Sequence, residues 1–180
     1  MTAARTTTIW LVTFLSTAAG AQSPLIGSEP PKLHGRTLDE KDIVLPDEAA
    51  GKVTMLVISL SRKAGEQSGS WREHFADDFA SDPHVTYYVT AMLQSAPSFI
   101  RGMIRSGIRK GTPAVAQSHV LTSAADESPW KQYLQIKDDT VPAILLLDPS
   151  GHVRWSYDGA FDSDHYRDLN AATVIARDRR

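Results

Sequence analysis

The side chains that could carry chemistry in this chain are histidines, carboxylates and serines, because the sequence contains no cysteine. The six histidines are scattered, and no two of them have the spacing typical of a metal site. The densest group of candidate metal ligands comprises Asp77, Asp78, Asp82 and His84. This group falls where a helix is expected to end and a turn to follow, a place where acidic side chains are usually solvated. The sequence therefore predicts no metal site and no cofactor.

Catalysis by a thiol or by an activated serine has no support in the sequence. A thiolate needs sulfur, so the absence of cysteine excludes thiol redox chemistry. No serine stands in a Gly-x-Ser-x-Gly motif, and no glycine-rich phosphate loop is present. Glu66 lies near an expected helix start, but a general acid or base needs a second titrating group within reach, and the sequence marks none. No catalytic residue is predicted.

Alternating strands and helices must position these residues. Residues 33–46 alternate apolar and polar positions around a turn at 39–42, which predicts a hairpin. Residues 53–59 form an almost continuous apolar run, as expected of a strand that is buried on both faces. Further strands are expected at residues 85–91, 118–122, 141–147 and 153–157.

The first helix is expected to follow a loop at residues 62–67. Ser70 and Glu73 form a capping-box pattern that favours a helix start there. The buried side of this helix is predicted to carry Trp71, Phe75 and Phe79.

Three later helices complete the expected set. They cover residues 98–110, residues 128 to about 135, and a final segment from residue 163. In the helix at 98–110, the side predicted to face the core carries Phe99, Met103, Ile104 and Ile108.

The composition is that of one globular domain. The chain has 180 residues, 42% of them hydrophobic and 22% charged, which is enough apolar material for a single core. The net charge of −2 gives no indication of a nucleic-acid partner. Residues 22–32 are predicted to be a linker, residues 33–176 the domain, and residues 177–180 a tail.

The first 21 residues have the pattern of a signal peptide. A basic start precedes the apolar run at residues 9–15, and small residues follow at 19–21. We expect cleavage between Ala21 and Gln22, and hence an exported protein, periplasmic or secreted. An uncleaved anchor or a mitochondrial presequence is the alternative.

The order of these elements resembles the thioredoxin-like superfamily over about residues 33–176. Three patterns carry the resemblance: the opening hairpin, the buried strand leading into the loop at 62–67, and the segment beginning with Val141 and Pro142. The resemblance implies a three-layer α/β fold in which helices flank a central mixed β-sheet with an N-terminal hairpin.

Within that superfamily the chain is most similar to the ATP-synthase assembly factors of the "Atp-ten" type. The matching residues are Ser70 and Trp71 followed by Phe75, residues 82–85, and residues 146–155. The sequence departs from those factors at Val141–Pro142 and in its signal peptide. Such factors act as chaperones for a membrane subunit of the synthase, so the resemblance implies a chaperone-like role and a protein client.

The resemblance also implies a site. The window at residues 64–67 occupies the corner where thioredoxin-like enzymes carry their thiols. Pro142 is expected to be cis, as in thioredoxins, although an ordinary trans proline at a strand start is the alternative. The predicted binding corner consists of Ala64, Gly65, Glu66, Gln67, Trp71, Val141 and Pro142.

A second candidate surface is a stripe of arginines. Arg101, Arg105 and Arg109 recur every four residues and therefore share one side of a helix. Such a stripe beside an apolar side could meet an acidic partner or anionic lipid, which would give a peripheral membrane contact. The alternative is the outer side of a docked helix.

Together these features predict an exported, non-redox binding or assembly protein for a membrane or respiratory complex such as ATP synthase. The alternative is an enzyme on the same scaffold, with Glu66 as a base or a metal at residues 77–84.

Overall fold

The computed structural model describes residues 25–179, so the predicted signal peptide and the first residues of the predicted linker lie outside the described part. Its centre is a seven-stranded sheet with the strand order β2-β1-β5-β4-β3-β6-β7. The strands are β1 (Leu33–Thr37), β2 (Asp42–Leu45), β3 (Val53–Ser59), β4 (Val85–Met92), β5 (Val120–Ser123), β6 (Ala143–Leu147) and β7 (Val153–Asp158). β3, β4 and β5 run parallel, and the other neighbouring pairs are antiparallel. The predicted mixed sheet and its opening hairpin are confirmed.

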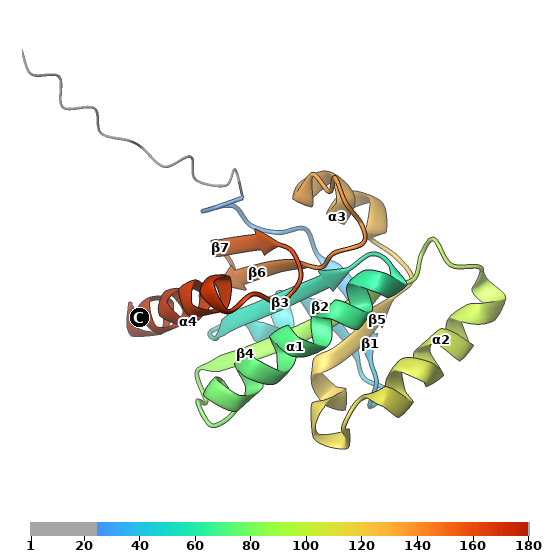
Figure 1. Cartoon of the computed structure of the whole chain (residues 1–180), viewed down its shortest axis with the longest axis horizontal. Helices are drawn as coiled ribbons and strands as arrows, with labels where there is room; N and C mark the ends of the chain where they lie inside the picture. The colour runs from blue at the N-terminus through green and yellow to red at the C-terminus, as the bar shows by residue number, and fades with distance from the viewer. Residues whose placement is uncertain (1–24, 180) are drawn as a thin grey trace, which may run out of the picture.

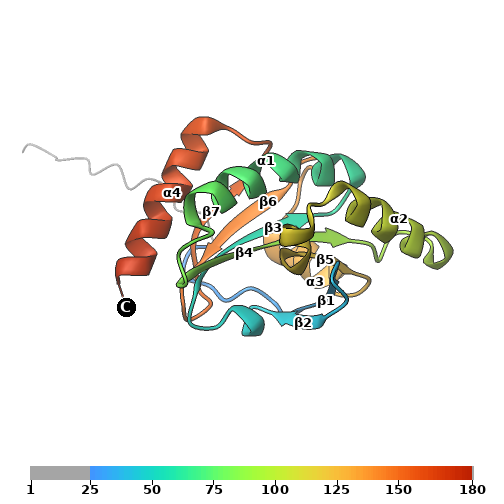
Figure 2. The same cartoon turned by 90° about the horizontal axis from the view of Figure 1, so that it is seen from below.

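Helices cover both faces of this sheet (Figures 1 and 2). α1 (Arg62–Phe79) and α4 (Ser163–Asp178) lie on one face, and α3 (Glu127–Leu134) lies on the other. Because side chains alternate along a strand, β3 sends Met55 and Val57 towards α1 and sends Leu56 and Ile58 towards the α3 side. The apolar run of β3 is therefore continuous because both of its faces are covered.

The first helix begins earlier than predicted. Ser61 is its N-cap, and the Ser61 hydroxyl accepts a hydrogen bond from the Ala64 amide at 3.2 Å. Ser70 therefore lies inside α1, and the expected loop at residues 62–67 is helical. The capping-box interpretation was wrong because the buried side of the helix already begins at Ala64, whereas the buried positions of Trp71, Phe75 and Phe79 are confirmed.

The start of α3 is also displaced from its predicted position. The helix begins at Glu127, and Asp126 precedes it in the left-handed region with φ of 64°. Ser128 and Pro129 thus lie in the first turn, where a proline is tolerated because the first amides have no partner within the helix.

The helix α2 (Ser98–Gly111) matches the prediction for only two of the four residues expected on its buried side. It lies at the end of the molecule farthest from α4 (Figures 1 and 2), and none of its residues is buried. Phe99 is 85% exposed and Met103 is 69% exposed, although both were expected to face the core, whereas Ile104 and Ile108 of the same predicted set are half-buried. The side that docks is the arginine side, because the Arg105 guanidinium donates to backbone carbonyls on β1.

Pro142 is not cis. Among residues 25–179 the cis peptide bond is Leu45–Pro46, so Val141–Pro142 is trans. Pro142 is buried immediately before β6, and its carbonyl accepts the Gly159 amide at 3.0 Å beyond the end of β7. Proline has no backbone N–H to donate to a neighbouring strand, and the position just before a strand does not need that donor.

Within residues 25–179, no helix is long and apolar enough to cross a membrane. Two short 3-10 helices, Asp47–Ala49 and Ala114–His119, complete the chain.

Candidate functional site

The predicted corner is closed by hydrogen bonds between the start of α1 and residues 139–142. The Ser61 hydroxyl donates to the Asp139 carbonyl at 2.6 Å, and the Gln67 side-chain amide donates to the Thr140 carbonyl at 3.2 Å. The structure therefore brings the window at residues 64–67 next to Val141 and Pro142. A role for this corner in binding a partner stays a prediction.

The polar side chains of the window are only partly satisfied, because Gln67 Oε1 is buried and has no hydrogen-bond partner among the described residues. Ala64 is buried, and Glu66 is exposed and pairs with Arg62 at 2.8 Å along the helix. Beneath them, the hydroxyls of Ser59 and Ser68 form a buried hydrogen bond of 2.6 Å. Where thioredoxin-like enzymes carry thiols, this chain thus has a buried methyl group, an exposed surface ion pair and a closed serine pair.

Trp71 is a core residue and not part of the corner surface. It is fully buried, and its indole N–H donates to the Gly159 carbonyl at 3.3 Å. Its ring packs edge-on against Phe161, with centroids 5.3 Å apart, and lies 5.7 Å from the ring of Tyr157. The prediction that Trp71 contacts a client was wrong because α4 and β7 cover this side of α1.

The arginine stripe attaches α2 to the hairpin. The Arg105 guanidinium donates to the Arg36 carbonyl and the Thr122 hydroxyl, both at 2.9 Å, and also to the Thr37 carbonyl. Arg105 and Arg109 both pair with Glu40, at 3.2 and 3.0 Å. Hydrogen bonding by Arg105 and the nearby positive charges lower the pKa of Glu40. Since these groups point towards the protein body, the predicted contact between the stripe and lipid was wrong for Arg105.

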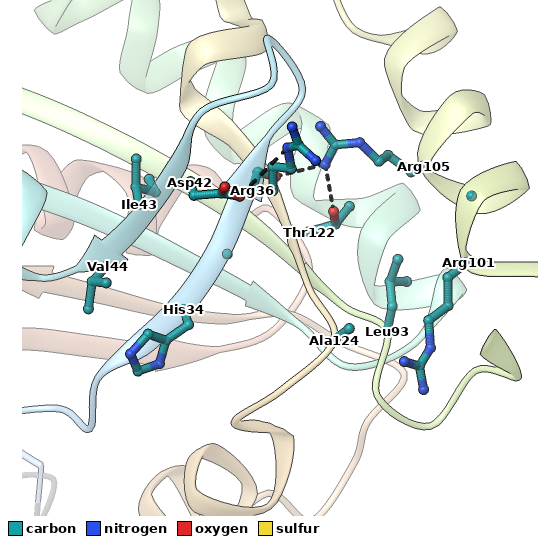
Figure 3. A pocket seen from close by; sticks show the side chains of 12 residues that line it. His34, Arg36, Asp42, Ile43, Val44, Leu93, Arg101, Arg105, Thr122 and Ala124 are labelled. Atoms are coloured by element: carbon teal, nitrogen blue, oxygen red, sulfur yellow. Dashed lines mark hydrogen bonds and ion pairs between the residues drawn. The ribbon is translucent and has the colours of Figure 1, made fainter.

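A groove of about 540 Å³ separates α2 from the hairpin (Figure 3). It is lined by both hairpin strands, by α2 and by the ends of β4 and β5. Arg101 projects from α2 towards the loop that carries Leu93, and His34 stands across the groove. The ring nitrogen Nδ1 of His34 lies 2.9 Å from an Asp126 carboxylate oxygen, which fixes the orientation of the imidazole. The remaining lining residues are Gly35, Arg36, Asp42, Ile43, Val44, Gly102, Arg105, Thr122 and Ala124.

The acidic segment at residues 77–84 is engaged in structural contacts. Asp78 accepts hydrogen bonds from the Tyr166 hydroxyl at 2.6 Å and from the Asn170 amide at 2.8 Å. Asp82 accepts from the His84 backbone amide at 2.9 Å and pairs with Arg177 at 3.2 Å. Within the described part of the chain, no three His, Asp or Glu side chains gather in a way that could hold a metal ion.

Of the two walls of the groove, the sequence pattern identified only the one formed by α2. The spacing of Arg101, Arg105 and Arg109 marked the helix, but the opposite wall comes from β1 and β2, about sixty residues earlier in the chain. A charged stripe opposite the apolar pair Phe99 and Met103 was the available signal that α2 docks through its polar side.

A family model described as ATP10 protein matches residues 29–174. No curated protein matches the chain.

Solved structures with the same architecture include thiol-disulfide proteins and an assembly protein. The putative thiol:disulfide interchange protein DsbE from Chlorobium tepidum has a TM-score of 0.62 at 14% identity, over 84% of this chain and 97% of that one. The thioredoxin domain of a thiol-disulfide oxidoreductase from Bacteroides vulgatus has a TM-score of 0.60 at 16% identity, over 83% and 98%.

BsSco, described as a member of the Sco family of cytochrome c oxidase assembly proteins, has a TM-score of 0.60 at 12% identity, over 88% of this chain and 98% of its own. At such identities these likenesses concern the fold alone. They confirm the predicted thioredoxin-like fold.

Proposed function

The chain belongs to the ATP10 protein family, and we propose that it is a non-redox assembly factor that holds an apolar segment of a membrane-complex subunit on α2. The name of the family model points to ATP synthase as the complex. Because the sequence has no cysteine, the chain itself supplies no thiol for exchange with a client. A binding function needs no thiol.

The observation that carries the proposal is the outward apolar side of α2. Phe99 and Met103 are four residues apart, so they lie one above the other on the helix, and both are largely exposed. Val115, just beyond the helix, is 88% exposed. Large apolar side chains gathered on one helix mark an interaction surface when the rest of the core is well covered. An apolar client segment would shield them from water.

Export is part of the same proposal. The apolar run at residues 9–15 and the small residues at 19–21 support a signal peptide, which would place the domain beside the membrane subunits of a respiratory complex. N-terminal sequencing of the protein purified from cells tests this. A mature chain that begins at Gln22 supports export, and a chain that keeps residues 1–21 contradicts the cleavage.

Site-specific crosslinking tests the client surface. Because the chain has no cysteine of its own, a single introduced cysteine is the only thiol that can be labelled. A photoreactive group is attached to Met103→Cys on α2 or to Ile175→Cys on α4, and intact cells are irradiated. Ile175 is a matched control because it is also an exposed apolar helix residue, at 51% exposure, on a different face.

We expect the label on α2 to capture a subunit of a membrane complex, identified by mass spectrometry, and the label on α4 not to capture it. Equal capture from both positions, or the absence of a membrane-complex subunit from the α2 adducts, would contradict the proposal.

A further inference from the structure

Arg101 is the exception among the three arginines of α2. Arg105 and Arg109 both form ion pairs with Glu40, which also pairs with Arg36. Arg101 forms no ion pair with any residue between 25 and 179. Its Nε donates to the Ala96 carbonyl and its Nη2 to the Gln94 carbonyl, both at 2.8 Å. The guanidinium is therefore held in place by the backbone while its charge is not neutralised.

The surroundings of this charge favour an anionic ligand with apolar neighbours. Arg101 borders the groove together with the side chains of Val44 and Leu93, as Figure 3 shows. The carboxylate that lines the groove, Asp42, lies 3.6 Å from Arg36. A fixed positive charge beside apolar walls attracts an anion more strongly than the same charge in open solvent does.

We infer that the groove binds an extended peptide in which a carboxylate side chain is flanked by apolar residues. The carboxylate would pair with Arg101, through the Nη1 that donates to no described residue, and the apolar side chains would lie against Val44 and Leu93. This inference rests on the proposed function and adds the chemistry that the client segment must carry. It places the peptide on the inner side of α2, opposite the outer apolar side.

Helix geometry favours a peptide over a lipid headgroup. Residues two positions apart on an α-helix point about 200° apart, so Arg101 faces away from both Phe99 and Met103. A membrane surface that covers Phe99 and Met103 therefore cannot reach Arg101. A chain that enters the groove beside the hairpin can reach it.

The test uses two synthetic blocked pentapeptides, Val-Leu-Glu-Leu-Val and its twin with Gln in place of Glu. Binding is followed by two-dimensional amide NMR of the domain. We expect the Glu peptide to shift the amide resonances of Val44, Leu93 and Arg101 and to bind about tenfold more tightly than its twin, as one charge-assisted pair allows. No preference for the Glu peptide in the wild-type protein would overturn the inference.

Two variants assign that preference to one side chain. Arg101→Gln should abolish the tenfold difference, whereas Arg109→Gln, on the same stripe but paired with Glu40, should retain it. Since Arg101→Gln also removes bonds to the loop, Ala124→Glu serves as a second variant, because it places a carboxylate in the groove and leaves those bonds intact. It should weaken binding of the Glu peptide. An unchanged preference in Arg101→Gln or in Ala124→Glu counts against the inference.

Binding to vesicles that contain phosphatidylglycerol tests whether Arg101 binds a lipid headgroup instead of a peptide. If Arg101→Gln lowers vesicle binding while the two peptides bind the wild-type protein equally, the ligand is a headgroup and the inference is wrong. Crosslinking at Met103 reports the outer side of α2 independently. A failure of the peptide test together with capture of a membrane subunit at Met103 would thus refute this inference and leave the proposed function standing.

Discussion

The corner at the start of α1 and the groove beside α2 are built in opposite ways. In the corner, Ser61 and Gln67 donate to backbone carbonyls across the gap, and the serine pair below is buried. In the groove, Arg101 retains a charge without an ion-pair partner among the described residues, and the same helix exposes Phe99 and Met103. The window at residues 64–67 is joined to the neighbouring loop by hydrogen bonds within the chain itself. The groove that we propose for a partner lies at the other end of the sheet.

The largest expected effect tests the side of α1 that lies beneath the corner. Trp71→Ala removes a fully buried indole and leaves a cavity between α1, β7 and α4, so we expect the free energy of unfolding to fall by about 3–5 kcal/mol. Urea titration followed by circular dichroism measures it.

Phe99→Ala is the matched control, because Phe99 is 85% exposed and its removal should change the free energy of unfolding by less than about 0.5 kcal/mol. If the two variants lose similar stability, the contrast between a packed region and an exposed one is wrong.

The successes and failures of the sequence analysis follow the same division. The strand at residues 53–59 could be predicted because both of its faces are covered and its pattern is uninterrupted. Trp71 and Phe75 could be assigned to the core because helical spacing alone groups them. The start of α1 was misplaced because Gly65 and the polar residues after it are typical of a loop, whereas Ala64 and Ser68 already lie on the buried side.

The orientation of α2 could not be predicted from its own sequence. Periodicity separates the arginines from Phe99 and Met103, but it does not tell which of these two sides docks. The acceptors that decide it, the carbonyls of Arg36 and Thr37, are 69 and 68 positions from Arg105. The groove depends on the same long-range packing.

Acidification should loosen α2 and leave the corner intact. The pKa of Glu40 lies below its ordinary value of 4.5, chiefly through hydrogen bonding by Arg105, so its carboxylate stabilises the docked helix above that pH. This stabilisation is lost as the pH falls below 4.5 through the folded pKa. Spin labels at Lys41→Cys and Ser106→Cys, compared at about pH 7 and about pH 3, should show a broader distance distribution at the lower pH.

Two controls sharpen this result. The variant Glu40→Gln should show the broad distribution at both pH values, because it cannot ionise. Labels at Ser70→Cys and Lys137→Cys span the corner, which Ser61 and Gln67 hold through bonds that do not titrate in this range. Their distance distribution should stay narrow. Equal broadening of both pairs would mean that the whole domain loosens, and the contrast between the two regions would fail.

The smallest expected effect concerns the window itself. Glu66 lies in the window at residues 64–67, but its carboxylate pairs only along the helix with Arg62, and that arginine side chain is 93% exposed. Exposed pairs of this kind contribute little because solvent screens them. Glu66→Gln should therefore change the free energy of unfolding by less than about 1 kcal/mol and leave capture of the client at Met103 unchanged. A large loss of capture in Glu66→Gln would indicate that the corner binds the partner. Glu66 has no structural role, so its effect would have to come from contact with the partner.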